Sequence, residues 1–131
     1  MDERSAYWLE MAEYDLETAG AMLETGRLLY VGFMCHQVIE KALKGYLVHA
    51  KREDPPYTHN LRMLAVSCGL YERLTDDQKE TMEMLEPLNI EARYPAYKEQ
   101  MLREMTPEKC AGIIRRTGAL HEWIKKLLSS E

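Results

Sequence analysis

The sequence has no apolar run long enough to cross a membrane and few residues that interrupt helices. Its apolar runs are only a few residues long, whereas a transmembrane helix needs about 20. Five prolines and seven glycines allow only a few breaks, so we expect long elements. The N-terminal residues Met1–Ser5 do not combine a basic region with an apolar stretch, so no signal peptide is predicted. We therefore expect a cytoplasmic protein that has no contact with membranes.

Cysteine is also scarce. The chain has three cysteines, Cys35, Cys68 and Cys110. Their number is odd, they are widely spaced and no two of them form a Cys-x-x-Cys pair, which argues against structural zinc and against a disulfide framework. We expect three reduced, mostly buried thiols. His36 and Glu40 are four residues apart and so have the spacing to ligate a metal together, but a side-chain pair or a packed histidine is the favoured interpretation. No metal and no cofactor is predicted.

Basic residues are outnumbered, with 17 Lys and Arg against 22 Asp and Glu and a formal net charge of −5. This balance excludes a strongly basic nucleic-acid clamp, although a local basic face stays possible. The 131 residues suit one domain spanning residues 1–131 with one core. The scattered glycines form no phosphate-binding loop.

What the sequence does contain is apolar residues repeated at spacings of three and four. This period predicts helices over Glu3–Thr25, over Leu28–Lys51 and from Pro107 to about Leu128. Gly26 is placed to end the first helix, and Thr106 precedes a proline at the first position of the last one. The second helix has a broad apolar face and a polar strip, which we expect to be solvated, with Glu40 and Lys44 paired. The residues of this strip are Gln37, Glu40, Lys41 and Lys44.

The middle of the chain predicts shorter elements. Thr58–Asn60 follows a Pro-Pro break and caps a short helix over Leu61–Cys68, which Gly69 ends. Thr75–Gln78 has the form of a capping box, and Pro87 should kink or end the helix that it opens. Residues 89–105 are the least regular, and Arg93-Tyr94-Pro95 is expected to be extended or turn-like. The predicted fold is all-α: an antiparallel up-and-down four-helix bundle with one extra short helix.

Four segments occur in an order typical of one family. They are Cys35–Lys44 (CHQVIEKALK), Thr58–Leu61 (THNL), Glu91–Pro95 (EARYP) and a first helix with Trp8, Ala12, Asp15 and Leu16. Together, over residues 4 to 126, they resemble HEPN domains, whose name refers to nucleotide binding in higher eukaryotes and prokaryotes. The resemblance implies a helical bundle that forms homodimers with a cleft between the subunits. It also implies a prokaryotic partner, a minimal nucleotidyltransferase, with which such proteins often act as a toxin–antitoxin pair.

Some HEPN proteins are metal-independent ribonucleases, which are marked by an Arg followed by four to six residues and a His. The histidine acts as general base or acid on the 2′-OH, and the arginine holds the phosphate. After Arg93 the corresponding positions are Lys98, Glu99 and Gln100, so the motif is absent there.

The same spacing occurs elsewhere in the chain. Arg52 precedes His59, and Arg115 and Arg116 precede His121, at a frequency near that expected by chance. Arg116 and His121 are five residues apart, which places them about 140° apart around one helix, so they would not converge within one chain.

Three functions stay open. In the favoured one, a binding module, a nucleotide or RNA occupies a cleft near Arg93, Tyr94 and His59, with charge added by Lys41 and Lys44. The structural alternatives are an ion pair or helix-end carbonyl for Arg93, a helix cap or packed imidazole for His59, and a solvated strip for the lysines.

The second function is a ribonuclease toxin with a variant site. His59 or His121 would then be the base, and Arg93, Arg52 or Arg116 would hold the phosphate. The third function is a dimeric interaction protein without a ligand.

Overall fold

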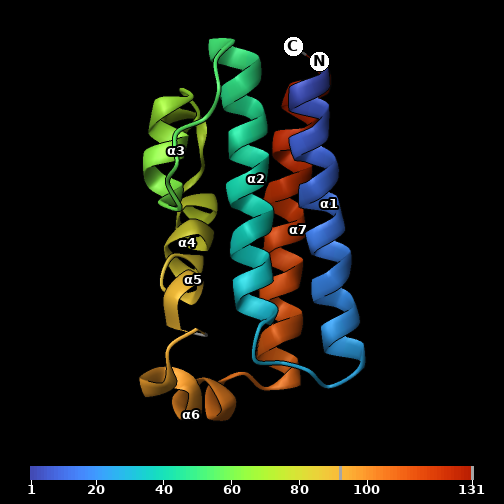
Figure 1. Ribbon diagram of the computed structural model, residues 1–131, viewed down its shortest axis with the longest axis vertical. Helices are drawn as coiled ribbons and strands as arrows, with labels where there is room; N and C mark the ends of the chain where they lie inside the picture. The colour runs from blue at the N-terminus through green and yellow to red at the C-terminus, as the bar shows by residue number, and fades with distance from the viewer. Residues whose placement is uncertain (92, 131) are drawn as a thin grey trace.

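The computed structural model describes residues 1–91 and 93–130, and over these residues it contains helices and no strand. Figure 1 shows their arrangement. In chain order they are α1 (Glu3–Glu24), α2 (Val31–Lys51), α3 (Leu61–Ser67), the 3-10 helix η1 (Tyr71–Arg73), α4 (Asp76–Leu85), α5 (Leu88–Glu91), α6 (Pro95–Glu104) and α7 (Pro107–Ser130).

The helices form a bundle of four columns (Figure 1). Three columns are the single helices α1, α2 and α7, and the fourth consists of α3, α4 and α5 stacked along α2. The chain descends along α1, ascends along α2, returns through the fourth column and ascends again along α7, so both termini lie at one end. This arrangement confirms the predicted all-α, up-and-down bundle.

Several predicted helix ends are confirmed by their local geometry. Gly26 follows α1 with φ = 74°, a left-handed conformation that costs glycine little. The Asn60 side chain accepts the N–H of Met63 at 2.9 Å and so caps α3. Thr75 and Gln78 form the predicted reciprocal capping box at the start of α4, with bonds of 2.9 and 3.1 Å. These caps fix where the fourth column begins and turns.

The stretch predicted to be least regular contains a helix, so that expectation is wrong for part of it. Tyr94 is extended, with φ = −110° and ψ = 130°, as predicted. Pro95 then occupies the first turn of α6, where its fixed φ favours the helix and its missing N–H costs nothing. Met101 and Met105 bury their side chains and hold this otherwise exposed helix against the end of the bundle. The fourth column also consists of short helices, since α4 ends at Leu85, just before Pro87.

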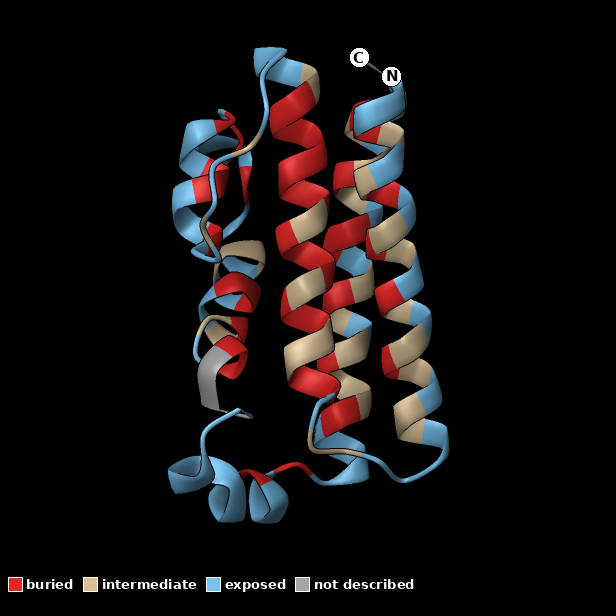
Figure 2. Ribbon diagram, viewed as in Figure 1, coloured by how far each residue is buried: buried red, intermediate tan, exposed pale blue. Residues whose placement is uncertain are grey.

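Glu40 and Lys44 of the polar strip of α2 are buried, although a solvated strip was predicted, and Gln37 and Lys41 are half-buried. Glu40 is 3% exposed and Lys44 is 7% exposed. The reason is that α2 is the central column and packs on α1, on α7 and on the fourth column at once (Figure 2). Burial of charged groups is costly unless they are paired, so this strip must supply its own partners.

Two expectations drawn from what the sequence lacks can be set against the structure. All three cysteines are free and buried, and burial raises the pKa of the Cys35 thiol to about 12. Within the part of the chain that the structure describes, no helix is both long enough and apolar enough to span a membrane.

Candidate functional site

Glu40 is the centre of a polar cluster inside the bundle. Its Oε2 accepts a hydrogen bond from Lys44 Nζ at 2.9 Å, and its Oε1 lies 2.9 Å from His59 Nδ1. Gln37 Nε2 donates to the same Oε1 at 3.5 Å, and His36 Nδ1 lies 3.6 Å from it. One buried carboxylate therefore holds a lysine, a glutamine and two histidines around it.

The sequence explains how these groups meet. His36, Gln37, Glu40 and Lys44 are three, four or seven residues apart, so they lie along one side of α2. His59 arrives from the loop that follows α2, and the cap made by the next residue, Asn60, fixes where that loop joins α3. His59 itself is not the helix cap, and its side chain is 61% exposed. It is therefore the member of the cluster that reaches solvent.

His36 lies beneath His59 and is fully buried. Its Nε2 is 3.8 Å from Glu86 Oε1, and neither ring nitrogen has a hydrogen-bond partner among the described residues. Burial lowers the pKa of His36 to about 4, against the opposing effect of Glu40. Burial and the nearby Glu40 charge raise the pKa of Glu86, whose Oε2 accepts the N–H of Leu61 at 3.0 Å. At neutral pH His36 is thus an uncharged spacer between two carboxylates.

Arg93 is held near this cluster by two contacts. Its Nε donates to the carbonyl of Asn89, in the short helix α5, at 2.9 Å, so the helix-end alternative for Arg93 is observed. Its guanidinium carbon also lies 5.4 Å from the centre of the Phe33 ring, a cation–π distance. Within the described residues, no acceptor is bonded to its two Nη groups. The guanidinium therefore keeps a pair of donors for a ligand.

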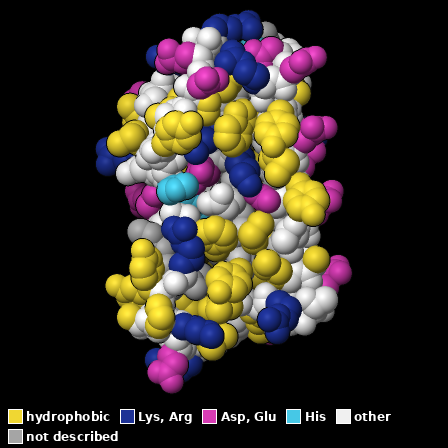
Figure 3. Space-filling view, in the orientation of Figure 1, with side chains coloured by type: hydrophobic (Ala, Val, Ile, Leu, Met, Phe, Trp, Pro, Cys, Tyr) yellow, Lys and Arg dark blue, Asp and Glu magenta, His cyan; other side chains and the backbone are white. Residues whose placement is uncertain are grey.

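A surface hollow of about 620 Å³ brings three of the predicted residues together. His59, Arg93 and Tyr94 line it, and Tyr94 is 54% exposed. Its other lining residues are Asn60, Glu86, Pro87 and Asn89. Figure 3 shows histidine near the middle of one face, with basic and acidic side chains close by and hydrophobic side chains around them. We call this hollow the His59–Arg93 hollow.

The two lysines predicted to add charge to the cleft lie elsewhere. Lys41 bonds to Asp15 of α1. Lys44 is paired with Glu40, and its Nζ lies 5.6 Å from the centre of the Trp8 ring. Neither lysine lines the His59–Arg93 hollow. Both contact α1, Lys41 through the Asp15 carboxylate and Lys44 through the Trp8 ring.

The other candidate histidine and arginines also lie apart from the hollow. His121 is buried between α7 and α1, 3.6 Å from Glu13, and burial lowers its pKa. Arg116 bonds instead to Asp77 of α4, at 3.1 Å, so it and His121 face different helices, as their angular separation predicts. Arg52 is exposed at the end of α2, with its Nη1 3.8 Å from Asp2.

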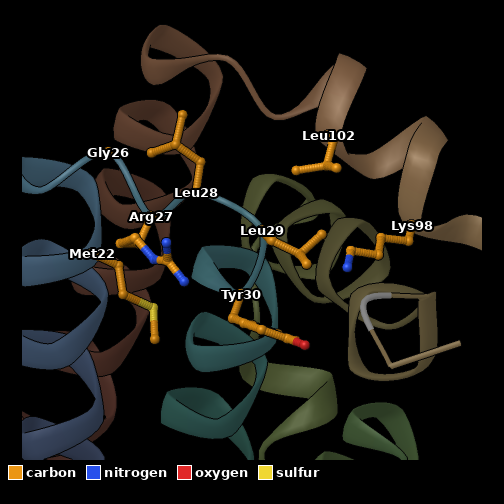
Figure 4. Close-up of a pocket in the computed structure, with 8 residues that line it drawn as sticks. All are labelled: Met22, Gly26, Arg27, Leu28, Leu29, Tyr30, Lys98 and Leu102. Atoms are coloured by element: carbon orange, nitrogen blue, oxygen red, sulfur yellow. The ribbon is translucent and has the colours of Figure 1, made fainter. Parts of the chain in front are cut away.

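A second hollow, of about 480 Å³, lies between the α1–α2 loop and α6 (Figure 4). Its walls are mainly apolar, with Met22, Leu29 and Leu102 among them, and Arg27 and Lys98 are its charged residues. Its lining contains no histidine, no carboxylate and no residue of the Glu40 cluster among the residues that the structure describes. We therefore place the candidate site at the His59–Arg93 hollow, where titratable and basic groups converge.

Metal binding finds no support in the arrangement of side chains. Over residues 1–91 and 93–130, no three or more His, Cys, Asp or Glu side chains are placed to hold a metal ion together. His36 and Glu40 instead form the side-chain pair that the sequence analysis favoured, with the imidazole packed inside the bundle.

Sequence reasoning missed the role of Glu40, Glu86 and Asn89 in placing the hollow. Glu40 sets the orientation of His59, Glu86 walls the hollow, and Asn89 supplies the carbonyl that holds Arg93. A signal was available for Glu40, since a carboxylate on an apolar helix four residues from both a histidine and a lysine requires buried partners. No spacing rule marks Asn89, because it acts through its backbone carbonyl, which holds Arg93, and through its Oδ1, which accepts a hydrogen bond at 3.4 Å from Gln37, 52 positions away in sequence.

Comparisons with known proteins agree with this architecture. The family model described as the HEPN domain matches residues 5–127. The crystal structure of TT1696 from Thermus thermophilus superposes with a TM-score of 0.81 at 22% identity, covering 95% of this chain and 98% of that one. The structure of ST0689, an archaeal HEPN homologue, superposes with a TM-score of 0.71 at 24% identity, covering 96% and 98%. No curated protein matches the chain.

Proposed function

Since the chain belongs to the HEPN domain family, we propose that it is a binding module for a nucleotide or nucleic acid, whose phosphate occupies the His59–Arg93 hollow. The main support is that an exposed imidazole and a guanidinium with two unengaged Nη groups line one hollow. A guanidinium binds a phosphate through two parallel charge-assisted hydrogen bonds, which suits the donors left on Arg93. The exposed ring of Tyr94 offers a surface for stacking a base.

The size and setting of the hollow support the same proposal. A volume of about 620 Å³ falls within the range of small-molecule sites. The Phe33 ring and the Asn89 carbonyl hold Arg93 before any ligand arrives, which reduces the entropy lost on binding. The overall charge of −5 favours a ligand that makes a few defined phosphate contacts over unspecific attraction to RNA.

Thermal unfolding in the presence of a panel of nucleotides tests this proposal. A nucleotide at about 100 times its Kd should add about 2.7 kcal/mol to the free energy of unfolding and raise the Tm by several degrees. Arg93→Gln should abolish the shift, whereas Arg103→Gln, which removes an exposed charge from α6, should preserve it. Equal shifts in wild type and Arg93→Gln would place the ligand elsewhere.

We also propose that two copies associate through the face that contains the hollow. The support is that hydrophobic side chains surround the histidine on this face in Figure 3, as they do at many association surfaces. Sedimentation equilibrium should give a mass near twice 15.3 kDa at micromolar concentration. A mass of one chain over the whole concentration range would contradict the dimer.

The proposed protein partner is a minimal nucleotidyltransferase in a toxin–antitoxin pair, on the basis of family membership alone. Expression of the chain should arrest growth, and co-expression of a nucleotidyltransferase encoded beside it should relieve the arrest. Growth unaffected by the chain alone would rule out the toxin role.

A second candidate function, metal-independent ribonuclease, is favoured by one observation. The 2.9 Å contact with Glu40 makes Nδ1 of His59 the donor, so Nε2 of the neutral imidazole would be the proton acceptor. His59 Nε2 would take the proton of a ribose 2′-OH. The 2′-oxygen would then attack the adjacent phosphorus while the P–O5′ bond breaks, giving a 2′,3′-cyclic phosphate. The departing 5′-oxygen would take a proton back from His59 Nε2 or from water to give the 5′-OH product, with Arg93 stabilising the charge on the phosphate.

Cleavage assays separate this enzyme from a binding module. An oligoribonucleotide should be cut to cyclic-phosphate ends, and the matching oligodeoxyribonucleotide should stay intact. His59→Ala should abolish cleavage, and His49→Ala, outside the cluster, should not. Binding without cleavage would leave the binding module as the function.

A further inference from the structure

A smaller hollow of about 290 Å³ adjoins the His59–Arg93 hollow. It lies between α3, η1 and α4, and its lining residues are Asn60, Arg62, Tyr71, Lys79, Met82, Glu83 and Glu86. Asn60 and Glu86 line both hollows, so the two cavities share a wall. The Asn60 end of the first hollow is therefore adjacent to the second. We call this neighbour the Tyr71 hollow.

Two cations are gathered on one aromatic ring in the Tyr71 hollow. The guanidinium carbon of Arg62 lies 5.2 Å from the centre of the Tyr71 ring, and Lys79 Nζ lies 4.5 Å from it. Arg62 comes from α3 and Lys79 from α4, so the fold brings together two charges 17 positions apart in sequence. Within the described part of the chain, neither forms an ion pair with a carboxylate. Both cations therefore line the Tyr71 hollow without a carboxylate partner among the described residues, and their donors are available to an anion.

Two carboxylates, those of Glu83 and Glu86, also line the Tyr71 hollow. Glu86 Oε2 accepts the Leu61 N–H at 3.0 Å, and its Oε1 lies 3.8 Å from the buried His36, so this carboxylate is held by contacts away from the two cations. Glu83 is exposed and, among the described residues, does not pair with either cation. Neither carboxylate therefore neutralises Arg62 or Lys79 through a direct contact.

We infer that Arg62 and Lys79 bind a second phosphate of the ligand whose first phosphate is held at Arg93, and that the ligand is therefore single-stranded nucleic acid. This inference rests on the proposed function, which supplies the first phosphate. A mononucleotide fills only the His59–Arg93 hollow. A strand continues past Asn60 and gains two further cationic contacts, as in other proteins whose basic grooves follow a single-stranded backbone.

The experiment compares 5′-AMP with a hexanucleotide of adenylate on four forms of the protein. They are the wild type, Arg93→Gln, the variant Arg62→Gln/Lys79→Gln, and the matched control Arg103→Gln/Lys109→Gln, which removes two exposed charges outside both hollows. Kd values are measured by fluorescence titration at several salt concentrations. Urea unfolding of each variant checks that the fold is retained.

In wild type and control, the hexanucleotide should bind at least about tenfold more tightly than AMP. In Arg62→Gln/Lys79→Gln this advantage should disappear while the Kd for AMP is unchanged. The slope of log K against log salt for the hexanucleotide should also fall by about 1.4, since each contact to single strands contributes about 0.7.

Any other result would overturn the Tyr71 subsite, the proposed His59–Arg93 site, or both. Equal Kd values for AMP and hexanucleotide, or an equal loss in the control, would reject the Tyr71 subsite and leave the proposed function standing. Hexanucleotide binding that needs Arg62 and Lys79 but survives Arg93→Gln would keep the subsite and reject the His59–Arg93 site. Absence of binding by both ligands would reject both.

Discussion

Nδ1 of His59 lies 2.9 Å from Oε1 of Glu40, so a buried carboxylate on α2 orients an exposed imidazole at the rim of a hollow. A carboxylate only accepts hydrogen bonds, so Nδ1 carries the proton in this contact, and Nε2 is the acceptor nitrogen of the neutral ring. The other oxygen of Glu40 is occupied by Lys44 at 2.9 Å, which fixes the carboxylate in turn. The chemistry available at His59 is thus set from inside the bundle.

Removing the charge of Glu40 should strongly destabilise the protein. Glu40→Gln leaves the Lys44 ammonium buried without its carboxylate, and breaking one side of a buried ion pair costs about 3–5 kcal/mol. The free energy of urea-induced unfolding at pH 7 measures this loss.

The second step of the same experiment removes both charges. Glu40→Gln/Lys44→Met should recover much of the stability lost in Glu40→Gln, because no unpaired charge is left. Destabilisation that instead adds up across the two substitutions would show that the pair is not the source of the effect.

Stability should fall on acidification because of His36. Its folded pKa is about 4, below the ordinary 6.5, since burial disfavours the imidazolium. The unfolded chain therefore binds more protons between these values, and stability is full above pH 6.5 and is lost as the pH falls toward 4. The difference corresponds to about 3 kcal/mol at most.

His36→Gln isolates this effect from that of His121, whose pKa burial also lowers. The variant should show a flatter dependence of unfolding free energy on pH between about 4 and 6.5, whatever its stability at pH 7. His49→Gln, outside the cluster, should keep the wild-type slope. Parallel curves for His36→Gln and wild type would refute the assignment.

Arginine at position 93 should not be replaceable by lysine. Arg93→Lys keeps the positive charge but loses the planar pair of Nη donors and the Nε that bonds to the Asn89 carbonyl. We expect nucleotide affinity to fall about tenfold or more, with little change in the free energy of unfolding. Wild-type affinity in this variant, measured by the same thermal shifts, would show that the charge alone matters.

Much of the fold was predictable because its determinants are local. The apolar period of α1, α2 and α7, the capping box of Thr75 and Gln78, and the stop at Gly26 each depend on residues a few positions apart. The helix α6 was missed because its amphipathic pattern is short. It is held instead by the burial of Met101 and Met105 at the end of the bundle.

The residues of the candidate site were likewise predictable where the signal lies in a short stretch of sequence, and not where it depends on contacts between helices. The motifs pointed to His59, Arg93 and Tyr94, and these residues do share one hollow. Lys41 and Lys44 were misplaced because periodicity shows which residues form a strip but not whether a neighbouring helix covers it. The contacts that place the site, from Glu40 to His59 and from Asn89 to Arg93, join different elements or use backbone atoms, so no spacing rule predicts them.

Gly32 should prove essential to the position of Arg93 although it contacts no ligand. A Cβ added at Gly32 would lie 2.7 Å from Cδ1 and 3.2 Å from Cβ of Leu88, the buried first residue of α5. Gly32→Ala therefore requires the Leu88 side chain to move. Because Cβ of Leu88 is itself 3.2 Å away, we expect α5 to shift slightly from α2, and with it the Asn89 carbonyl that holds Arg93. Overpacking costs about 1–3 kcal/mol, which outweighs the gain of about 1 kcal/mol from alanine in a helix.

Gly20→Ala is the matched control, because a Cβ at this position in α1 meets nothing within 4 Å. It should raise the free energy of unfolding by about 0.5–1 kcal/mol and leave nucleotide affinity unchanged. Gly32→Ala should lower both stability and affinity. If Gly32→Ala lost stability but bound nucleotide as tightly as wild type, α5 would be a packing element only, and the link from α2 through Leu88 and Asn89 to Arg93 would be wrong.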